Sequence, residues 1–223
     1  MMKLKCLLCF IILILQLFSY QSAGIDSVKD YKNMPGIQVY HFRSRSYFMY
    51  SSWEKVDETT IKGQLSLYIG NMFDIPAEGM WVSAGLGSPG MDSSDMVMCM
   101  FYPNAKVTHK CVDYWSEGHH PQPDTQLGGT NDVELTSSHS DLNLNTNEWG
   151  NYNKAIVWNF TKKITNDIYD WKNLDSIMTN KGYIIGAYGD TYTNGDIKFH
   201  SDYTSNKLID GDGLPKKDKK SDL

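Results

Sequence analysis

The chain has 223 residues, of which 41% are hydrophobic and 21% are charged, and its formal net charge is −5 at pH 7. This length and composition suit a single domain with a substantial apolar core. The excess of acidic residues argues against nucleic acid and anionic membranes as partners, because both require a basic surface.

Residues 1–24 have the pattern of a signal peptide. Lys3 and Lys5 give a basic start, an apolar run follows from Cys6 to Phe18, and small residues suited to cleavage precede residue 25. No later apolar stretch approaches the length of a membrane span. We therefore expect an exported mature chain without a membrane span, either extracellular or in the lumen of the secretory pathway. It would keep 19 basic and 26 acidic residues, a net charge of −7.

Alternation of apolar and polar residues predicts many short strands separated by turn residues. Strands are expected at residues 36–42, 47–56, 61–69, a pair within 79–102, 107–115, 131–135, 155–160 and 182–188. Residues 117–130 are rich in Gly and Pro and are expected to form a surface loop, and residues 166–173 a short helical turn. The pattern as a whole predicts an all-β antiparallel sandwich.

The strand pair within residues 79–102 presents one methionine, Met91, directly after the turn Gly87-Ser88-Pro89-Gly90. Met96, Met98 and Met100 then fall on one face of the second strand. Three thioethers on one face suit cuprous copper, but the lining of a pocket or core is the favoured interpretation, because methionine fills irregular apolar space well.

Two cysteines, Cys99 and Cys111, remain once the signal peptide is removed. They flank the turn Tyr102-Pro103-Asn104-Ala105, and a hairpin at this turn would place them opposite each other. We expect a disulfide in an oxidising compartment, with two free buried thiols as the alternative. Asn159-Phe160-Thr161 is the single sequon for N-linked glycosylation.

The order of several short motifs resembles that of the DOMON domain, in particular the haem-binding type found in the cytochrome domain of cellobiose dehydrogenase. The resemblance extends over about residues 37–205. It implies an immunoglobulin-like β-sandwich. The segments that carry it are Trp81 to Gly85, Gly90-Met91, Ser94-Asp95-Met96-Val97, Val112 to Ser116, Pro123-Asp124, Val157 to Phe160, Asp167, Asp170, Ile184 to Gly189, and His200.

In haem-binding members of that family, the turn methionine and the late histidine are the axial ligands of the iron. The resemblance therefore implies that Met91 and His200 bind the iron of a haem b, held without covalent attachment because the sequence contains no Cys-x-x-Cys-His motif. Residues expected beside the cofactor are Trp81, Met96, Met98 and Tyr188. With both axial positions filled, the expected role is transfer of single electrons to or from a separate redox partner, and not catalysis.

A carbohydrate-binding or other ligand-binding module without haem is the alternative, because 6 Trp and 14 Tyr residues offer flat rings for stacking on sugars. A hydrolase is not expected, since no nucleophile elbow is present. We expect the DOMON domain at residues 25–208 and a disordered Lys-rich tail at residues 209–223. The last four residues, Lys-Ser-Asp-Leu, loosely resemble a retrieval signal of the endoplasmic reticulum.

Overall fold

The computed structural model describes residues 37–43, 46–87, 90–118, 120–144, 151–165, 168–170 and 183–207. All of these belong to a compact unit of residues 34–223. The expected signal peptide at 1–24, the expected tail at 209–223 and most of the expected helical turn at 166–173 lie outside the described residues. The domain limits at residues 25 and 208 therefore stay predictions.

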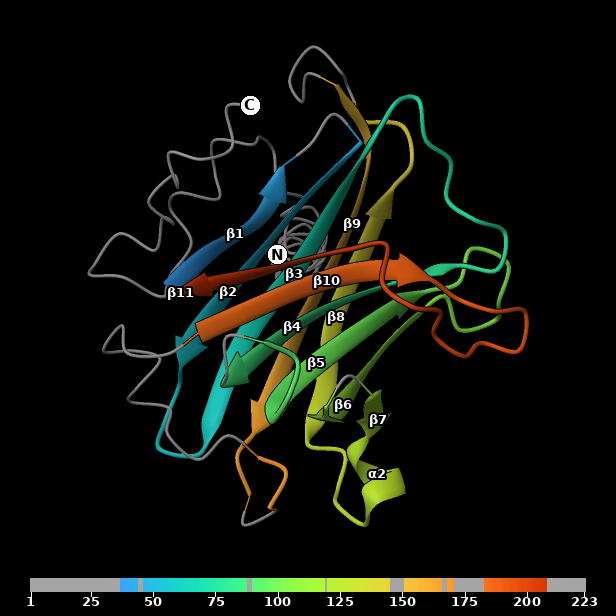
Figure 1. Cartoon of the computed structure of the whole chain (residues 1–223). Helices are drawn as coiled ribbons and strands as arrows, with labels where there is room; N and C mark the ends of the chain where they lie inside the picture. Colours follow the sequence, from blue (N-terminus) through green and yellow to red (C-terminus); the bar gives the residue numbers. More distant parts are fainter. Residues whose placement is uncertain are drawn as a thin grey trace, which may run out of the picture. The chain divides into compact units, whose positions relative to one another are not determined.

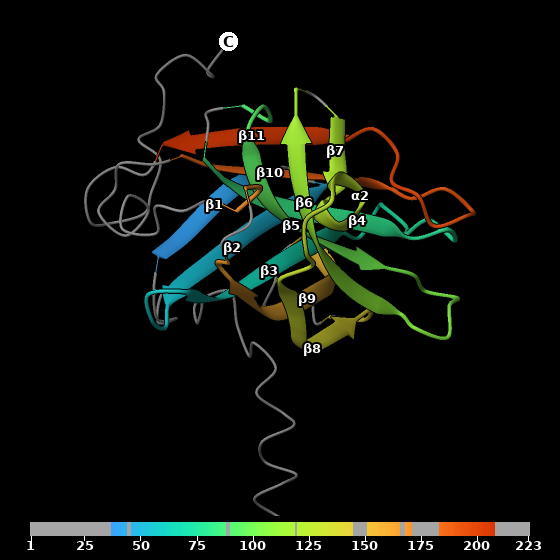
Figure 2. The same ribbon diagram turned by 90° about the horizontal axis from the view of Figure 1, so that it is seen from below.

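The described residues form two antiparallel sheets, which confirms the predicted all-β sandwich (Figure 1). Sheet A has the strand order β1-β2-β3-β9-β8, and sheet B has the order β11-β10-β4-β5-β6-β7. Seen from below, the two sheets lie as layers over each other (Figure 2). The elements are β1 (Ile37–Arg43), β2 (Tyr47–Lys55), β3 (Thr60–Gly70), β4 (Met80–Gly87), β5 (Ser94–Phe101), β6 (His109–Glu117), β7 (His120–Pro123), α2 (Asp124–Leu127), β8 (Val133–Asp141), β9 (Tyr152–Lys163), β10 (Tyr183–Asp190) and β11 (Asp202–Lys207).

The main core lies between the sheets and is built from alternate residues of the strands. Burying each large apolar side chain stabilises the fold by about 1.5–3 kcal/mol. Because side chains alternate between the faces of a strand, the intervening residues of β4, β5 and β10 face away from this core. Its buried members include Leu65, Leu67, Ile69, Val82, Ala84, Leu86, Val97, Ile156, Trp158, Phe160 and Ile184.

Cys99 of β5 and Cys111 of β6 pair directly in the sheet register and are joined by a disulfide. The predicted bridge is confirmed, and the alternative of two free thiols is excluded. Both residues are buried and belong to the core between the sheets. The bridge therefore fixes β5 to β6 from the core side.

The differences from the predicted strands concern the edges of the two sheets. Residues 117–130 were expected to be a loop but contain β7 and the single turn α2, whereas β8 extends to Asp141 and β11 was not predicted as a strand. All three unexpected or extended strands are edge strands, paired on one side only. Edge strands tolerate proline and polar residues, so apolar alternation does not reveal them.

A buried ionic cluster connects the two sheets. Lys162 of β9 places its ammonium 3.0 Å from a carboxylate oxygen of Asp95 and 3.1 Å from one of Asp170, and it also donates a short hydrogen bond to Asp113. Asp95 and Asp113 belong to β5 and β6 of sheet B, so one cation from sheet A serves two strands of the other sheet. Lys162 is only 1% exposed, and buried charges require such partners.

The cluster contains more acid than base, and this affects the protonation of Asp113. Burial raises the pKa of Asp113 to about 9, against the opposing effect of Lys162 and with a further contribution from Asp95 and Asp124. Burial lowers the pKa of Lys162, but Asp95, Asp113 and Asp170 together raise it by more, so the net shift is upward. In the folded protein at neutral pH, Lys162 is therefore charged and Asp113 keeps its proton.

Replacing Lys162 by Ala should lower the free energy of unfolding by roughly 3–5 kcal/mol, because it leaves buried carboxylates without their cation. Urea denaturation followed by tryptophan fluorescence would measure this loss. Lys163 is the next residue of β9 and its side chain is exposed. Lys163→Ala is the matched control and should change the stability by less than ~0.5 kcal/mol. Equal stability of the two variants would contradict a supporting role of the cluster.

Stability should fall as the pH rises from 6.5 to 9. Asp113 has a pKa of about 9 in the folded protein, against an ordinary value of 3.8, so in this window the folded state holds a proton that the unfolded state lacks. The slope is up to about −1.4 kcal/mol per pH unit. Burial lowers the pKa of His41 to about 3, which affects stability only below its ordinary value of 6.5.

The measurement is urea unfolding at several pH values in this window, with Asp113→Asn as the comparison. The Asn variant has no carboxyl group that titrates at this position, so its stability should change much less over the same pH range. Parallel profiles for the two proteins would show that Asp113 is already ionised in the folded state.

Candidate functional site

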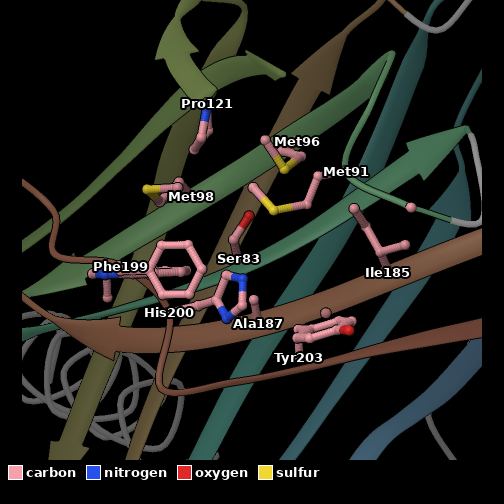
Figure 3. A pocket seen from close by; sticks show the side chains of 13 residues that line it. Ser83, Met91, Met96, Met98, Pro121, Ile185, Ala187, Phe199, His200 and Tyr203 are labelled. Atoms are coloured by element: carbon pink, nitrogen blue, oxygen red, sulfur yellow. The ribbon is translucent and has the colours of Figure 1, made fainter. Parts of the chain in front are cut away.

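A cavity of about 530 Å³ lies on the outer face of sheet B, over β4, β5 and β10 (Figure 3). Its floor consists of residues that alternate with the main core, and its rim comes from connections and from β7 and β11. This size is typical of small-molecule and cofactor sites, which are about 300–1,000 Å³. The lining residues are Trp81, Ser83, Gly90, Met91, Met96, Met98, Pro121, Ile185, Gly186, Ala187, Phe199, His200 and Tyr203.

Strand alternation explains why this outer face is apolar. Along β5, Asp95 and Val97 face the other sheet, so Met96 and Met98 face outward into the cavity. Together with Trp81 and Ile185 the two methionines belong to a second cluster of buried apolar residues, separate from the main core. A folded protein rarely presents so much outward apolar surface unless something binds there.

Met91 lies in the connection between β4 and β5, and hydrogen bonds hold this connection in place. The Ser94 hydroxyl donates to the carbonyl of Gly90 over 2.8 Å, and the Ser94 amide donates to the carbonyl of Met91 over 3.2 Å. The Ser93 amide donates to the carbonyl of Ser116 on β6 over 2.8 Å. Met91 is half-buried, and its sulfur points into the cavity (Figure 3).

His200 lies in the connection between β10 and β11, on a different side of the cavity from the Met91 turn (Figure 3). Its ring packs between two aromatic neighbours, with centroids 4.1 Å from Phe199 and 4.9 Å from Tyr203. The backbone around it is fixed at two points. The Trp81 indole donates to the carbonyl of Lys198 over 3.1 Å, and the amide of Ser201 donates to the carbonyl of Tyr188 over 2.8 Å.

Two glycines allow side chains of the cavity floor to pack directly against the backbone of the sheet. A Cβ atom on Gly85 would lie 2.5 Å from the Met96 side chain, and one on Gly189 would lie 2.8 Å from the indole nitrogen of Trp81. Real Cβ atoms do not approach other atoms so closely, so each position requires a residue without a side chain. These glycines therefore explain why Met96 and Trp81 can lie flat over β4 and β10.

The hydroxyl of Ser83 is an unsatisfied polar group in this otherwise apolar floor. The side chain is 3% exposed, and the described residues offer its oxygen no hydrogen-bond partner. Buried polar groups of this kind are usually satisfied by water or by a ligand. Ser83 was not among the site residues expected from the sequence, although its alternation with Trp81 and Gly85 on β4 places it on the same face.

The structure brings five of the six expected site residues to one cavity, namely Trp81, Met91, Met96, Met98 and His200. Tyr188 does not line it. This residue belongs to the main core, where its ring lies 4.5 Å from that of Tyr47. The remaining eight lining residues were not expected as site residues from the sequence, and they are Ser83, Gly90, Pro121, Ile185, Gly186, Ala187, Phe199 and Tyr203.

A second group of residues that could bind a metal ion lies in the ionic cluster. Carboxylate oxygens of Asp113, Asp132 and Asp170 lie within 4.8 Å of one another. Two of these acids already contact the ammonium of Lys162, and Asp132 accepts hydrogen bonds from Thr130 and Thr165. The cluster thus contains its own cation, and we treat it as a structural feature.

Comparison with known proteins adds no assignment for the cavity. No protein-family model matches the chain. No curated protein sequence matches it at a significant level. Among the described residues, no helix is long and apolar enough to cross a membrane.

Filling the cavity should abolish the binding of an apolar dye. Ala187 lines the cavity, so Ala187→Phe should reduce the fluorescence of bound anilinonaphthalene sulfonate to near the level in buffer. Ala105 lies in the exposed turn between β5 and β6, and Ala105→Phe is the matched control. Equal fluorescence for both variants would show that the dye does not enter this cavity.

Proposed function

We propose that this chain is a haem-binding module of the DOMON type, exported from the cytosol, that passes single electrons to or from a separate redox partner. The observation that carries the proposal is the meeting of Met91 and His200, which come from distant parts of the sequence, at one apolar cavity (Figure 3). A thioether and an imidazole are a known axial pair for haem iron. The immunoglobulin-like topology of that family is part of the same proposal.

The lining of the cavity fits a haem. Its floor and walls are mostly apolar, its volume of about 530 Å³ suits a cofactor, and the two donors lie on separate connections. The unpaired Ser83 hydroxyl gives the floor one polar group that a bound molecule could satisfy. Non-covalent attachment follows because both cysteines of the mature chain are used in the disulfide.

Met91 and His200 would hold the iron from two sides, and Met96, Met98 and Ile185 would exclude water from the macrocycle. When bound, haem supplies reversible exchange of one electron, and a methionine ligand favours the reduced state. Because two protein side chains would hold the iron, substrate would not reach it, which favours electron transfer over catalysis. Phe199 and Tyr203 border the opening and would form part of the contact surface for a partner.

The acidic mature surface suggests the charge of that partner. A net charge of −7 would attract a protein with a basic docking face and accelerate their encounter. Export is supported by the basic and apolar start of the sequence and by the disulfide, which forms in oxidising compartments. A location outside the cell or in the lumen of the secretory pathway is consistent with both.

A carbohydrate-binding module without haem is the second candidate. The observation that favours it is the exposure of two rings at the opening, with Phe199 77% and Tyr203 63% exposed. Flat exposed rings are suited to stacking on sugars. The floor argues against it, because a sugar needs several hydrogen bonds and Ser83 is the only hydroxyl among the strand residues of the floor.

The test is the absorption spectrum of the mature protein after haem supplementation, before and after reduction with dithionite. We expect a sharp Soret band that shifts on reduction, with narrow α and β bands. Met91→Leu keeps the volume but removes the sulfur, and His200→Gln removes the imidazole, so either change should abolish the low-spin six-coordinate spectrum.

Two control variants make this test specific. Met96→Leu removes a thioether from the same cavity without removing a proposed ligand, and His139→Gln changes an exposed histidine of β8. Both should keep the spectrum of the unaltered protein. A featureless visible region in the supplemented protein would reject haem and make binding to glycans the next measurement.

A further inference from the structure

The sequon at Asn159 lies on the outer face of sheet A, on the side away from the haem cavity. Asn159 belongs to β9, where Trp158 and Phe160 on either side face the core, so its own side chain faces outward. β9 lies between β3 and β8, and Asn159 pairs with Gln64 on one side and Ser137 on the other. A modification here would therefore emerge from the middle of a sheet and not from a loop.

The side chain of Asn159 has a fixed orientation. Its Oδ1 atom accepts a hydrogen bond from Gln64 Nε2 over 2.8 Å, and its Nδ2 atom donates to the Ser137 hydroxyl over 3.0 Å. Gln64 is held in turn by the hydroxyl of Tyr50, which donates to its Oε1 over 2.6 Å. This row of hydrogen bonds crosses four strands and directs the amide nitrogen toward exposed Ser137.

A polar groove of about 420 Å³ lies on the same face, and Asn159 is one of the residues that line it. Glu54 and Lys62 contribute a carboxylate and an ammonium, while Ser52, Gln64 and Thr161 contribute uncharged polar groups. Hydroxyl and acetamido groups of a sugar require this mixture of donors and acceptors. In the haem cavity the lining is apolar, so the two depressions suit different chemistry.

We propose that Asn159 carries an N-linked glycan and that its first N-acetylglucosamine lies in this groove, bonded to Glu54 and Lys62. The proposal rests on the export of the chain, which is one part of the proposed function, and is independent of haem. The donor is a polyprenyl-diphosphate-linked oligosaccharide, transferred to the unfolded chain by the oligosaccharyltransferase of the secretory pathway. A bond forms between Nδ2 and C1 of the sugar, the bond from C1 to the phosphate oxygen breaks, and the lipid diphosphate leaves with the bonding electrons.

The structure is compatible with this product. The amide nitrogen loses one of its two protons in the transfer and keeps the other, so a donor remains for the Ser137 hydroxyl. The Oδ1 atom keeps its bond from Gln64, because glycosylation does not change this acceptor. The glycan would then cover the outer face of sheet A near β3, β8 and β9, and leave sheet B as the accessible face for a redox partner.

The first experiment translates the full chain in the presence of rough microsomes, and protection from added protease reports import independently of glycosylation. We expect the imported chain to shift in mobility on treatment with peptide N-glycosidase F. Thr161→Ala removes the sequon but keeps the Asn159 side chain, so it should abolish the shift, whereas Thr161→Ser keeps the sequon and should retain it. An imported chain without a shift, or a chain that is not imported, would overturn the proposal.

The second experiment tests whether the sugar lies in the groove. It measures the rate at which peptide N-glycosidase F releases the glycan from the native glycoprotein. A sugar held in the groove should be released more slowly from native than from denatured protein. In the double variant Glu54→Ala and Lys62→Ala, native release should be roughly tenfold faster, the factor that one or two net hydrogen bonds supply. The variant Lys55→Ala and Glu58→Ala removes a charged pair outside the groove and is the matched control. Equal rates for both double variants would place the glycan outside the groove.

Discussion

The ionic cluster around Lys162 is the constraint on which the rest of this sandwich depends. A buried ammonium from sheet A must meet carboxylates from β5 and β6 of sheet B, because an unpaired charge in this position would be strongly unfavourable. The requirement fixes which residues of β5 face the core. With Asp95 directed inward, Met96 must face outward, and a slip of one residue would move the acid to the surface and the methionines into the core. The same pairing that joins the sheets therefore sets the face of the cavity.

The two halves of the candidate site are both held by hydrogen bonds to their backbone. The Met91 turn is bonded through Ser94 to its own backbone and through Ser93 to β6, next to the ionic cluster. On the other side, His200 is flanked by Phe199 and Tyr203, both highly exposed, and its backbone is tied to sheet B at Lys198 and Ser201. Both proposed ligands therefore lie on connections whose backbone is hydrogen-bonded to sheet B.

The sequence predicts the centre of this fold better than its margins, and the reasons are physical. Central strands such as β3 and β9 must be apolar on the face that is buried, so alternation reveals them, whereas the sequences of the edge strands β7 and β11 show no such pattern. The cavity residues Met96 and Met98 follow from the same alternation. Tyr188 was expected beside the cofactor but lies in the main core, because β10 is apolar on both faces and the sequence does not distinguish its two sides. Lys162 had a detectable signal, since it shares the spacing of the core residues Trp158 and Phe160.

Three methionines line the cavity, and their environments differ in a way that fits the proposal of Met91 as the iron ligand. Met96 and Met98 stand on a central strand of sheet B, are almost fully buried and pack within the second apolar cluster, so their sulfurs contribute to the walls. Met91 is half-buried and lies on a connection between strands. Backbone atoms and the Ser94 hydroxyl make the hydrogen bonds that hold this connection, and the Met91 side chain takes no part in them. Residues that bind ligands are commonly found on loops positioned by a rigid scaffold. The Met91 side chain packs against the second apolar cluster but is only partly buried, so the sulfur that we propose as an iron ligand is less enclosed than those of Met96 and Met98.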